Sequence, residues 1–406
     1  MRKFLVIFLT LLFVVSLFSI SFAGEKVLKI GAAVSMTGKF AREGKMIMDG
    51  YNLWKDYVNG KGGIKVGNDV YKVEIKYYDD KSDAQTSAKL TEKLITQDKV
   101  NFIFGPYSSN ITYATSNINE KYKVLMIASM ANVNKIFTRG YKYIFAVLPL
   151  ADKYMYPLLD FAKNEDYLNP KPKSVAVISA NSFFPLAAAK GAVKYAKKLG
   201  FRILAFDKYP ANAKDLSPVL SKIKTRKPDI LISAGFYQHA LLVTKQAKEL
   251  KVSPKILGFT VGAVLPDFRE SLKQDAEYIY GPEWWIPEMD WKCPVFGNTE
   301  NYVKLVKEKY GYVPDYHVAG ASNAGVLLQI AIEKAGSIET EKVRETLSKL
   351  DTETFFGPIA FDKAGRNIKG SGALVQVQNN YPVPVYPRNM RGWKKAIYPM
   401  PPWDKR

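Results

Sequence analysis

The sequence predicts an α/β protein made of two doubly wound lobes, and three observations carry that prediction. From residue 27 onward, short apolar runs rich in β-branched residues alternate with longer segments of helical periodicity. The alternation forms two successive series, which favours two sheets over one large sheet. The length of 406 residues exceeds one ordinary core and suits two domains.

The first series reads as strands and helices in turn. Its apolar residues are continuous in the short segments, as in buried parallel strands, and recur at helical spacing in the long ones. The expected elements are strand 27–34, helix 43–59, strand 71–78, helix 84–97, and strands 100–104 and 124–128 with a helix between them.

The second series begins after residue 173 and repeats the pattern. Three further helices follow it, and we expect the chain to return to the first lobe there. The expected elements are strand 174–179, helix 183–200, strand 201–206, strand 229–234, helix 238–250 and strand 255–259, and then helices 299–310, 317–335 and 340–350.

Residues 1–23 have the features of a secretory signal peptide. Arg2 and Lys3 precede an apolar run, and the small residues Ser21 and Ala23 end it. The alternative is an uncleaved membrane anchor, because the run is just long enough to span a bilayer. The sequence predicts cleavage after Ala23 and a free chain that is periplasmic or secreted, since nothing later is long and apolar enough to span a membrane.

The formal charge of +21 raises the possibility of a nucleic-acid partner. The excess is spread along the chain, mostly as lysines on the polar faces of helices. This distribution is typical of a solvated surface, so no nucleic-acid partner is expected. Attraction to anionic surfaces of the cell envelope stays open.

Residues with catalytic or metal-binding chemistry are sparse. The only histidines are His239 and His317, and the single cysteine, Cys293, has no histidine near it in sequence. The segment 31–40, "GAAVSMTGKF", lacks the glycine spacing and the final Ser or Thr of a phosphate loop. We therefore expect no enzyme, no metal and no cofactor.

Polar residues follow three strands of the first series, where a doubly wound sheet binds its ligands. Ser35 to Thr37 follow the first strand, Tyr107 to Ser109 follow "NFIF", and Ser129 to Asn132 follow "VLMIA". Ser109 or Asn110 would also cap the next helix, whose free backbone N–H groups favour an anion such as a carboxylate. The alternative is a serine that only caps its helix.

These residues belong to a set of stretches that resembles a known family. The chain is similar to the periplasmic substrate-binding proteins of branched-chain amino acid ABC transporters, the leucine/isoleucine/valine-binding proteins. The matching stretches are "LKIGAAVSMTGKFAREGKMIMDGYNLWKDYVNGKGGI", "VNFIFGPYSSN", "VLMIASMANVNKIFTRGYKYIF", "YGYVPDYHVAGASNAGVLLQIAIEKAG" and "TFFGPIAFDKAGRN".

The resemblance implies a type I periplasmic binding protein fold, with two lobes joined by a hinge of three crossings. Lobe 1 would comprise residues 24–149 and 287–368, and lobe 2 residues 150–286 and 369–406. It also implies closure on one small ligand and delivery of that ligand to a membrane permease. We expect the chain to be a monomer.

The resemblance also implies roles for individual residues. Ser109 falls on the serine that binds a ligand carboxylate, and Asp152 is the only acid where relatives meet the ligand ammonium from lobe 2. Asn132 replaces a threonine, and Glu43 lies where relatives often have tyrosine. The candidate ligand-binding residues are Glu43, Tyr107, Ser108, Ser109, Met130, Ala131, Asn132, Asp152, Phe236, Tyr237, Thr260, Glu283 and Trp284.

One acid expected in an amino-acid site is missing. Relatives supply it after the strand "KILGF", but the segment "TVGAVLP" that starts at Thr260 has none. A buried ammonium without a partner is costly, so Glu43 or Glu283 could substitute, or the ligand could be an amide, a carboxylate without an amine, or an aromatic acid. Two rival functions stay open beside the solute-binding protein: an exported hydrolase of small amides and a ligand-sensing receptor domain.

Overall fold

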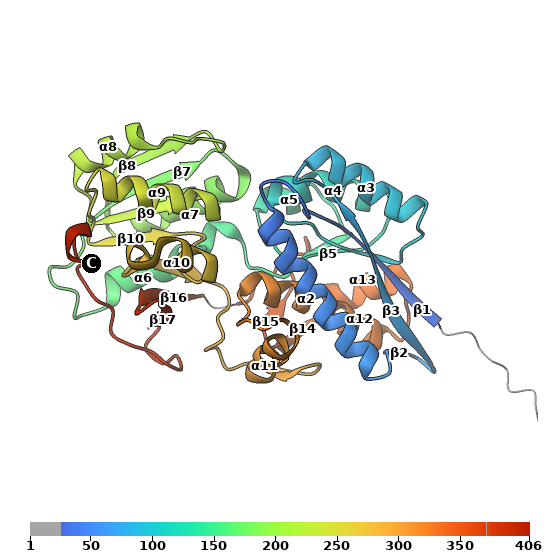
Figure 1. Cartoon of the computed structure of the whole chain (residues 1–406). Coiled ribbons are helices and arrows are strands. Elements are labelled where there is room, and N and C mark those ends of the chain that lie inside the picture. Colours follow the sequence, from blue (N-terminus) through green and yellow to red (C-terminus); the bar gives the residue numbers. More distant parts are fainter. Residues whose placement is uncertain (1–25, 371) are drawn as a thin grey trace, which may run out of the picture.

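Two β-sheets, each flanked by helices, form two lobes that lie side by side (Figure 1). The structure is a computed structural model that describes residues 26–370 and 372–406. The predicted signal peptide, residues 1–23, lies outside the described residues. Within the described ranges, no helix combines the length and the apolar character that a membrane span requires.

The first sheet has six strands in the order β2-β3-β1-β4-β5-β6. All neighbours are parallel except the hairpin of β2 and β3. The lobe contains β1 (Lys26–Val34), α2 (Ala41–Gly60), β2 (Ile64–Val66), β3 (Asp69–Asp79), α3 (Ala84–Thr96), β4 (Phe102–Phe104), α4 (Ser109–Tyr122), β5 (Met126–Ala128), α5 (Asn134–Phe137) and β6 (Ile144–Ala146).

The second sheet has seven strands in the order β17-β16-β11-β10-β9-β7-β8. Its last two strands are antiparallel additions at one edge. The elements are η1 (Ala151–Lys153), α6 (Tyr156–Asn164), β7 (Ser174–Ala180), α7 (Phe183–Lys198), β8 (Arg202–Tyr209), α8 (Ser217–Arg226), β9 (Ile230–Ala234), α9 (Tyr237–Glu249), β10 (Ile256–Phe259), α10 (Pro266–Leu272), η2 (Lys273–Ala276), β11 (Tyr280–Glu283), β16 (Ala373–Gln378) and β17 (Tyr381–Tyr386).

The chain returns to the first lobe after β11, as the sequence predicts. Helix α12 packs against α2 so closely that a β-carbon added to Gly50 would lie 2.3 Å from the Val318 carbonyl oxygen. On the α12 side, a β-carbon added to Gly325 would lie 2.1 Å from the Trp54 ring, so small residues are needed on both helices. The returning elements are β12 (Lys292–Cys293), β13 (Gly297–Asn298), α11 (Thr299–Tyr310), α12 (Tyr316–Ala335), α13 (Thr340–Ser348), β14 (Asp351–Thr354) and β15 (Gly357–Ala360).

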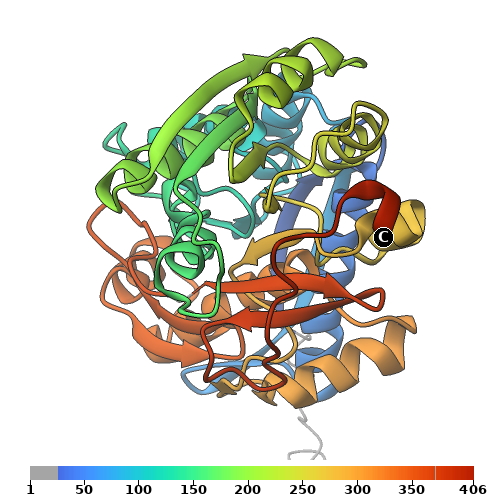
Figure 2. The same ribbon diagram turned by 90° about the vertical axis from the view of Figure 1, so that its left-hand side faces the viewer.

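The two lobes are joined by three crossings, which follow β6, follow β11 and precede β16. The C-terminal segment, red in Figure 2, then runs over the second lobe and ends in η3 (Trp403–Lys405). The Met400 N–H donates to the Lys255 carbonyl at 3.0 Å, and the Trp403 indole donates to the Val252 carbonyl at 2.8 Å. The predicted fold class, two doubly wound lobes with a three-crossing hinge, is confirmed.

Candidate ligand site between the lobes

A cavity lies where the carboxyl ends of strands from both sheets face each other. Its volume is about 20 Å³, room for roughly one water molecule. The lobes are therefore closed around a small space. The cavity is lined by Tyr107, Ser108, Ser109, Met130, Leu148, Tyr154, Phe184, Phe236 and Tyr316.

The stretch after β4 is held in an unusual backbone conformation. Ser108 has φ 70° and ψ 140°, outside the regions that non-glycine residues favour, and such strain is found mainly at functional sites. Its hydroxyl accepts a hydrogen bond from the Ile111 N–H at 3.5 Å and is the N-cap of α4. The prediction that Ser109 or Asn110 caps this helix is therefore wrong, because the chain enters the helix one residue earlier.

Capping by Ser108 leaves the hydroxyl of Ser109 free. Ser109 is 2% exposed and lines the cavity, and its Oγ has no hydrogen-bond partner within residues 26–370 and 372–406. The first N–H groups of α4 also lack partners within the helix. A buried polar atom without a partner is costly, so this end of the cavity suits an anionic or polar group of a ligand.

The rest of the cavity wall is largely aromatic. The Phe236 ring centre lies 6.1 Å from that of Tyr107 and 5.8 Å from that of Phe184. Tyr154 meets Phe184 edge to face at 5.5 Å. These rings come from both lobes and the first crossing, so closure of the lobes assembles the apolar wall.

Tyr154 links the cavity to a buried acid. Its hydroxyl donates to Glu283 Oε2 at 2.9 Å, while Glu283 Oε1 has no partner among the described residues. Burial raises the pKa of Glu283 well above its usual value. The ring of Trp284 lies 5.7 Å from that of Tyr154, and its indole N–H also lacks a partner in the described chain. Neither Glu283 nor Trp284 lines the cavity.

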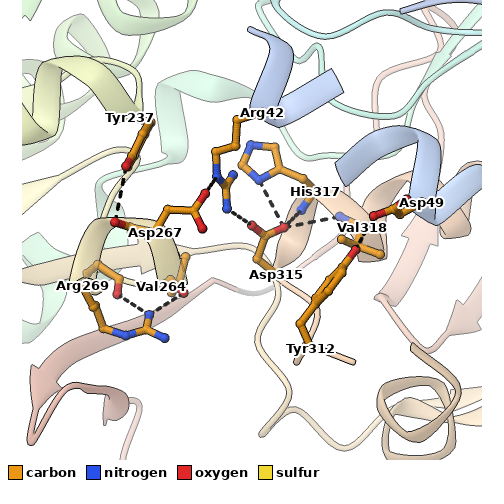
Figure 3. Close-up of polar contacts among 11 residues, drawn as sticks. Arg42, Asp49, Tyr237, Val264, Asp267, Arg269, Tyr312, Asp315, His317 and Val318 are labelled. Atoms are coloured by element: carbon orange, nitrogen blue, oxygen red, sulfur yellow. Dashed lines mark hydrogen bonds and ion pairs between the residues drawn. The ribbon is translucent and has the colours of Figure 1, made fainter. Parts of the chain in front are cut away.

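A cluster of charged side chains lies beside the cavity, where α2, α10 and α12 meet (Figure 3). Arg42 of α2 contacts Asp267 of α10 and donates to Asp315 at 3.0 Å. Asp315 caps α12 and also accepts from the His317 N–H at 2.9 Å. Burial raises the pKa of Asp315, but His317 and Arg42 outweigh that effect and hold the pKa well below its usual value. The Arg42 cluster thus spans both lobes.

Glu43 is next to this cluster and not in the cavity wall. It is buried, with 3% exposed, and burial raises its pKa against the opposing effect of His317 and Arg42.

No group of His, Cys, Asp and Glu within the described ranges could hold a metal ion.

Other candidate residues are placed around the cavity without lining it. Asp152 is exposed in η1. Asn132 donates to the Pro149 carbonyl at 2.6 Å, and the Thr260 hydroxyl donates to the Gly235 carbonyl at 2.8 Å. Tyr237 donates to the Asp267 carbonyl at 3.3 Å, and Ala131 is fully buried. Of the candidate residues, the structure brings Tyr107, Ser108, Ser109, Met130 and Phe236 together at the cavity.

Four lining residues are absent from the sequence-based set: Leu148, Tyr154, Phe184 and Tyr316. Phe184 follows β7 by a few residues, so the strand-end rule applied to the second lobe would have found it. Leu148 and Tyr154 flank the first crossing. Tyr316 begins a helix far along the chain, and no local pattern marks it.

Two lobes that enclose a small cavity between their strand ends define a solute-binding protein, the class that the sequence predicts. The chain belongs to the periplasmic binding protein family, whose model matches residues 27–382. That family consists of binding proteins, which fits the expectation that this protein is not an enzyme.

Named relatives and solved structures agree in fold. The chain is 26% identical over 353 residues to the leucine-, isoleucine-, valine-, threonine- and alanine-binding protein of Pseudomonas aeruginosa, covering 86% of this chain and 88% of that protein. The leucine-binding protein LivK of Thermotoga maritima has a TM-score of 0.77 at 24% identity, over 88% of this chain and 97% of that one. A Rhodopseudomonas palustris solute-binding protein in complex with 3,4-dihydroxybenzoic acid has a TM-score of 0.76 at 20% identity, over 94% and 100% of the two chains.

Proposed function

We propose that this protein is the extracytoplasmic solute-binding component of an ABC importer. It holds a small solute that bears a carboxylate in the cavity between its lobes and delivers that solute to a membrane permease. Removal of residues 1–23 would release the mature chain to the periplasm or the exterior, as a monomer. Lobe 1 is assigned to residues 24–149 and 287–368, and lobe 2 to residues 150–286 and 369–406.

The observation that carries the proposal is the free hydroxyl of Ser109. It is buried, it lines the cavity beside the first turn of α4, and it has no partner in the described chain. A ligand carboxylate would accept hydrogen bonds from this hydroxyl and from the N–H groups of the helix. Each hydrogen bond to a charged group contributes roughly 1.5 to 3 kcal/mol.

The relatives support a range of ligands. The Pseudomonas aeruginosa protein is named for amino acids, and the Rhodopseudomonas palustris protein binds an aromatic acid. The ligand of this chain is thus to be sought among amino acids, amides and aromatic acids. In each case it would touch both lobes, because the cavity wall comes from both.

A thermal-shift screen over these three ligand groups tests the proposal, since a ligand that binds only the folded state raises the melting temperature. Titration calorimetry on each hit gives stoichiometry and Kd, and we expect one site per chain. Small-angle scattering should show a smaller radius of gyration with ligand. An unchanged radius would count against closure, and release of product from a bound amide would favour a hydrolase.

A further inference from the structure

On the basis of that proposed function, we infer that the solute is an aromatic monocarboxylate without an ammonium group. The inference rests on the single anion anchor of the cavity, on the absence of charged side chains among its lining residues, and on its aromatic wall. An α-amino acid brings two opposite charges and needs a partner for each.

The lining residues provide a partner for only one of those charges. Ser109 and the first turn of α4 suit the carboxylate. The remaining lining side chains within the described ranges are aromatic or aliphatic, apart from Ser108, whose hydroxyl already accepts from Ile111. A desolvated ammonium would therefore be left without a carboxylate in the wall.

The acids near the cavity are exposed or already engaged. Asp152 faces solvent in η1. Asp267 and Asp315 both bind Arg42. These acids therefore do not supply a free negative charge to the cavity.

Two glutamates remain, and both lie behind the wall. Glu43 is buried beside Arg42 and His317. Glu283 does not line the cavity: its Oε2 accepts from the Tyr154 hydroxyl at 2.9 Å, and its Oε1 has no partner among the described residues. Burial favours its protonated form. A neutral acid behind a tyrosine gives little stabilisation to an ammonium.

The body of the cavity favours a ring. Phe236 packs against Tyr107 and Phe184, with ring centres 6.1 and 5.8 Å apart, so contacting aromatic rings form this part of the wall. Five of the nine lining residues are aromatic, so the wall suits a planar ring with a carboxylate. Benzoate and 3-phenylpropanoate represent this class.

The test compares ligands that differ only in the amino group. Titration calorimetry on the mature chain would measure Kd for 3-phenylpropanoate against L-phenylalanine and for 4-methylpentanoate against L-leucine, with benzoate as a third acid. We expect 3-phenylpropanoate or benzoate to bind, and 3-phenylpropanoate to bind at least tenfold more tightly than L-phenylalanine. A smaller ratio, tighter binding of L-leucine than of every aromatic acid, or no binding by either aromatic acid would overturn the inference.

Ser109→Ala separates this inference from the function on which it rests. The variant should weaken binding of each carboxylate probe at least tenfold, whether or not the probe carries an amino group. Ser217→Ala, the same change at the start of α8, is the matched control and should have no effect. If amino acids bind best and still require Ser109, the inference fails and the proposed function stands; if Ser109→Ala changes nothing, the carboxylate anchor itself fails.

Discussion

The Arg42 cluster and the Ser109 end of the cavity lie at the same lobe boundary and differ in how their polar atoms are satisfied. In the cluster, Arg42 joins Asp267 of one lobe to Asp315 of the other (Figure 3). At the cavity, the buried hydroxyl of Ser109 has no partner in the described chain. The carboxylates of the cluster are paired across the lobe boundary, although Arg42 Nη1 and His317 Nε2 lack partners among the described residues. The unpaired hydroxyl of Ser109 differs because it lines the cavity, where a ligand can reach it.

This difference predicts two kinds of mutant. Changes in the cluster should lower the stability of the fold or of the closed form. Changes at the cavity end should lower ligand affinity and leave stability nearly intact. The predictions below run from the largest expected effect to the smallest.

Asp315→Ala should lower the free energy of unfolding by about 3 to 5 kcal/mol, because it leaves the largely buried Arg42 with only the part-exposed Asp267 as its partner and removes the cap of α12. Urea denaturation measures the change. Asp267→Ala is the control, since the Asp267 side chain is 45% exposed and should cost about 1 kcal/mol or less. Equal losses in the two variants would contradict the view that burial of the pair matters.

Glu283→Gln should remove a pH dependence of stability. Burial raises the pKa of Glu283 in the folded state, so its contribution is present below the unfolded pKa of about 4.3 and is lost as pH rises toward the folded pKa. Over that window the wild type should lose about 1.4 kcal/mol of unfolding free energy per pH unit relative to the variant. Urea titrations from pH 4 to pH 8 check this, and a constant difference between the two proteins would show that Glu283 is ionised in the fold.

Ser108 and Ser109 are adjacent and should respond in opposite ways. Ser109→Ala should weaken carboxylate binding at least tenfold, or by about 1.4 kcal/mol or more, without lowering the melting temperature. Ser108→Ala should lower stability by about 1 kcal/mol, because it removes the cap of α4. Calorimetric titration beside thermal melts of both variants decides the roles, and loss of stability in Ser109→Ala with intact affinity would reverse them.

Asn110→Ala should have the smallest effect and act on closure. The Asn110 amide oxygen accepts from the Phe183 N–H at 3.1 Å, so α4 of one lobe caps α7 of the other. Its loss should weaken binding by about 0.5 to 1 kcal/mol through faster ligand release. Asn117→Ala is the control, because Asn117 lies on the same helix and bonds Tyr141 within its own lobe. Stopped-flow dissociation rates that are equal in the two variants would contradict a role in closure.

The sequence by itself determined the order of the main strands and helices, although it missed α6, α8 and the edge strands β16 and β17. Periodicity depends on neighbouring residues, so helix 299–310 was predicted at its observed bounds, and β1, predicted at 27–34, is observed one residue longer. The strand-end rule also placed Tyr107, Ser109 and Met130 at the cavity, because parallel strands end at one edge of a sheet.

Only the tertiary structure decided which residues that are far apart in the sequence meet at the lobe boundary. Arg42 and Asp267 are 225 positions apart, and no local pattern pairs them. The same holds for Tyr316 in the cavity wall, and for Asn110, which caps a helix of the other lobe. The tertiary structure also decided which residue caps α4. The backbone of Ser108 takes a positive φ that its residue type disfavours and that only the surrounding contacts can hold.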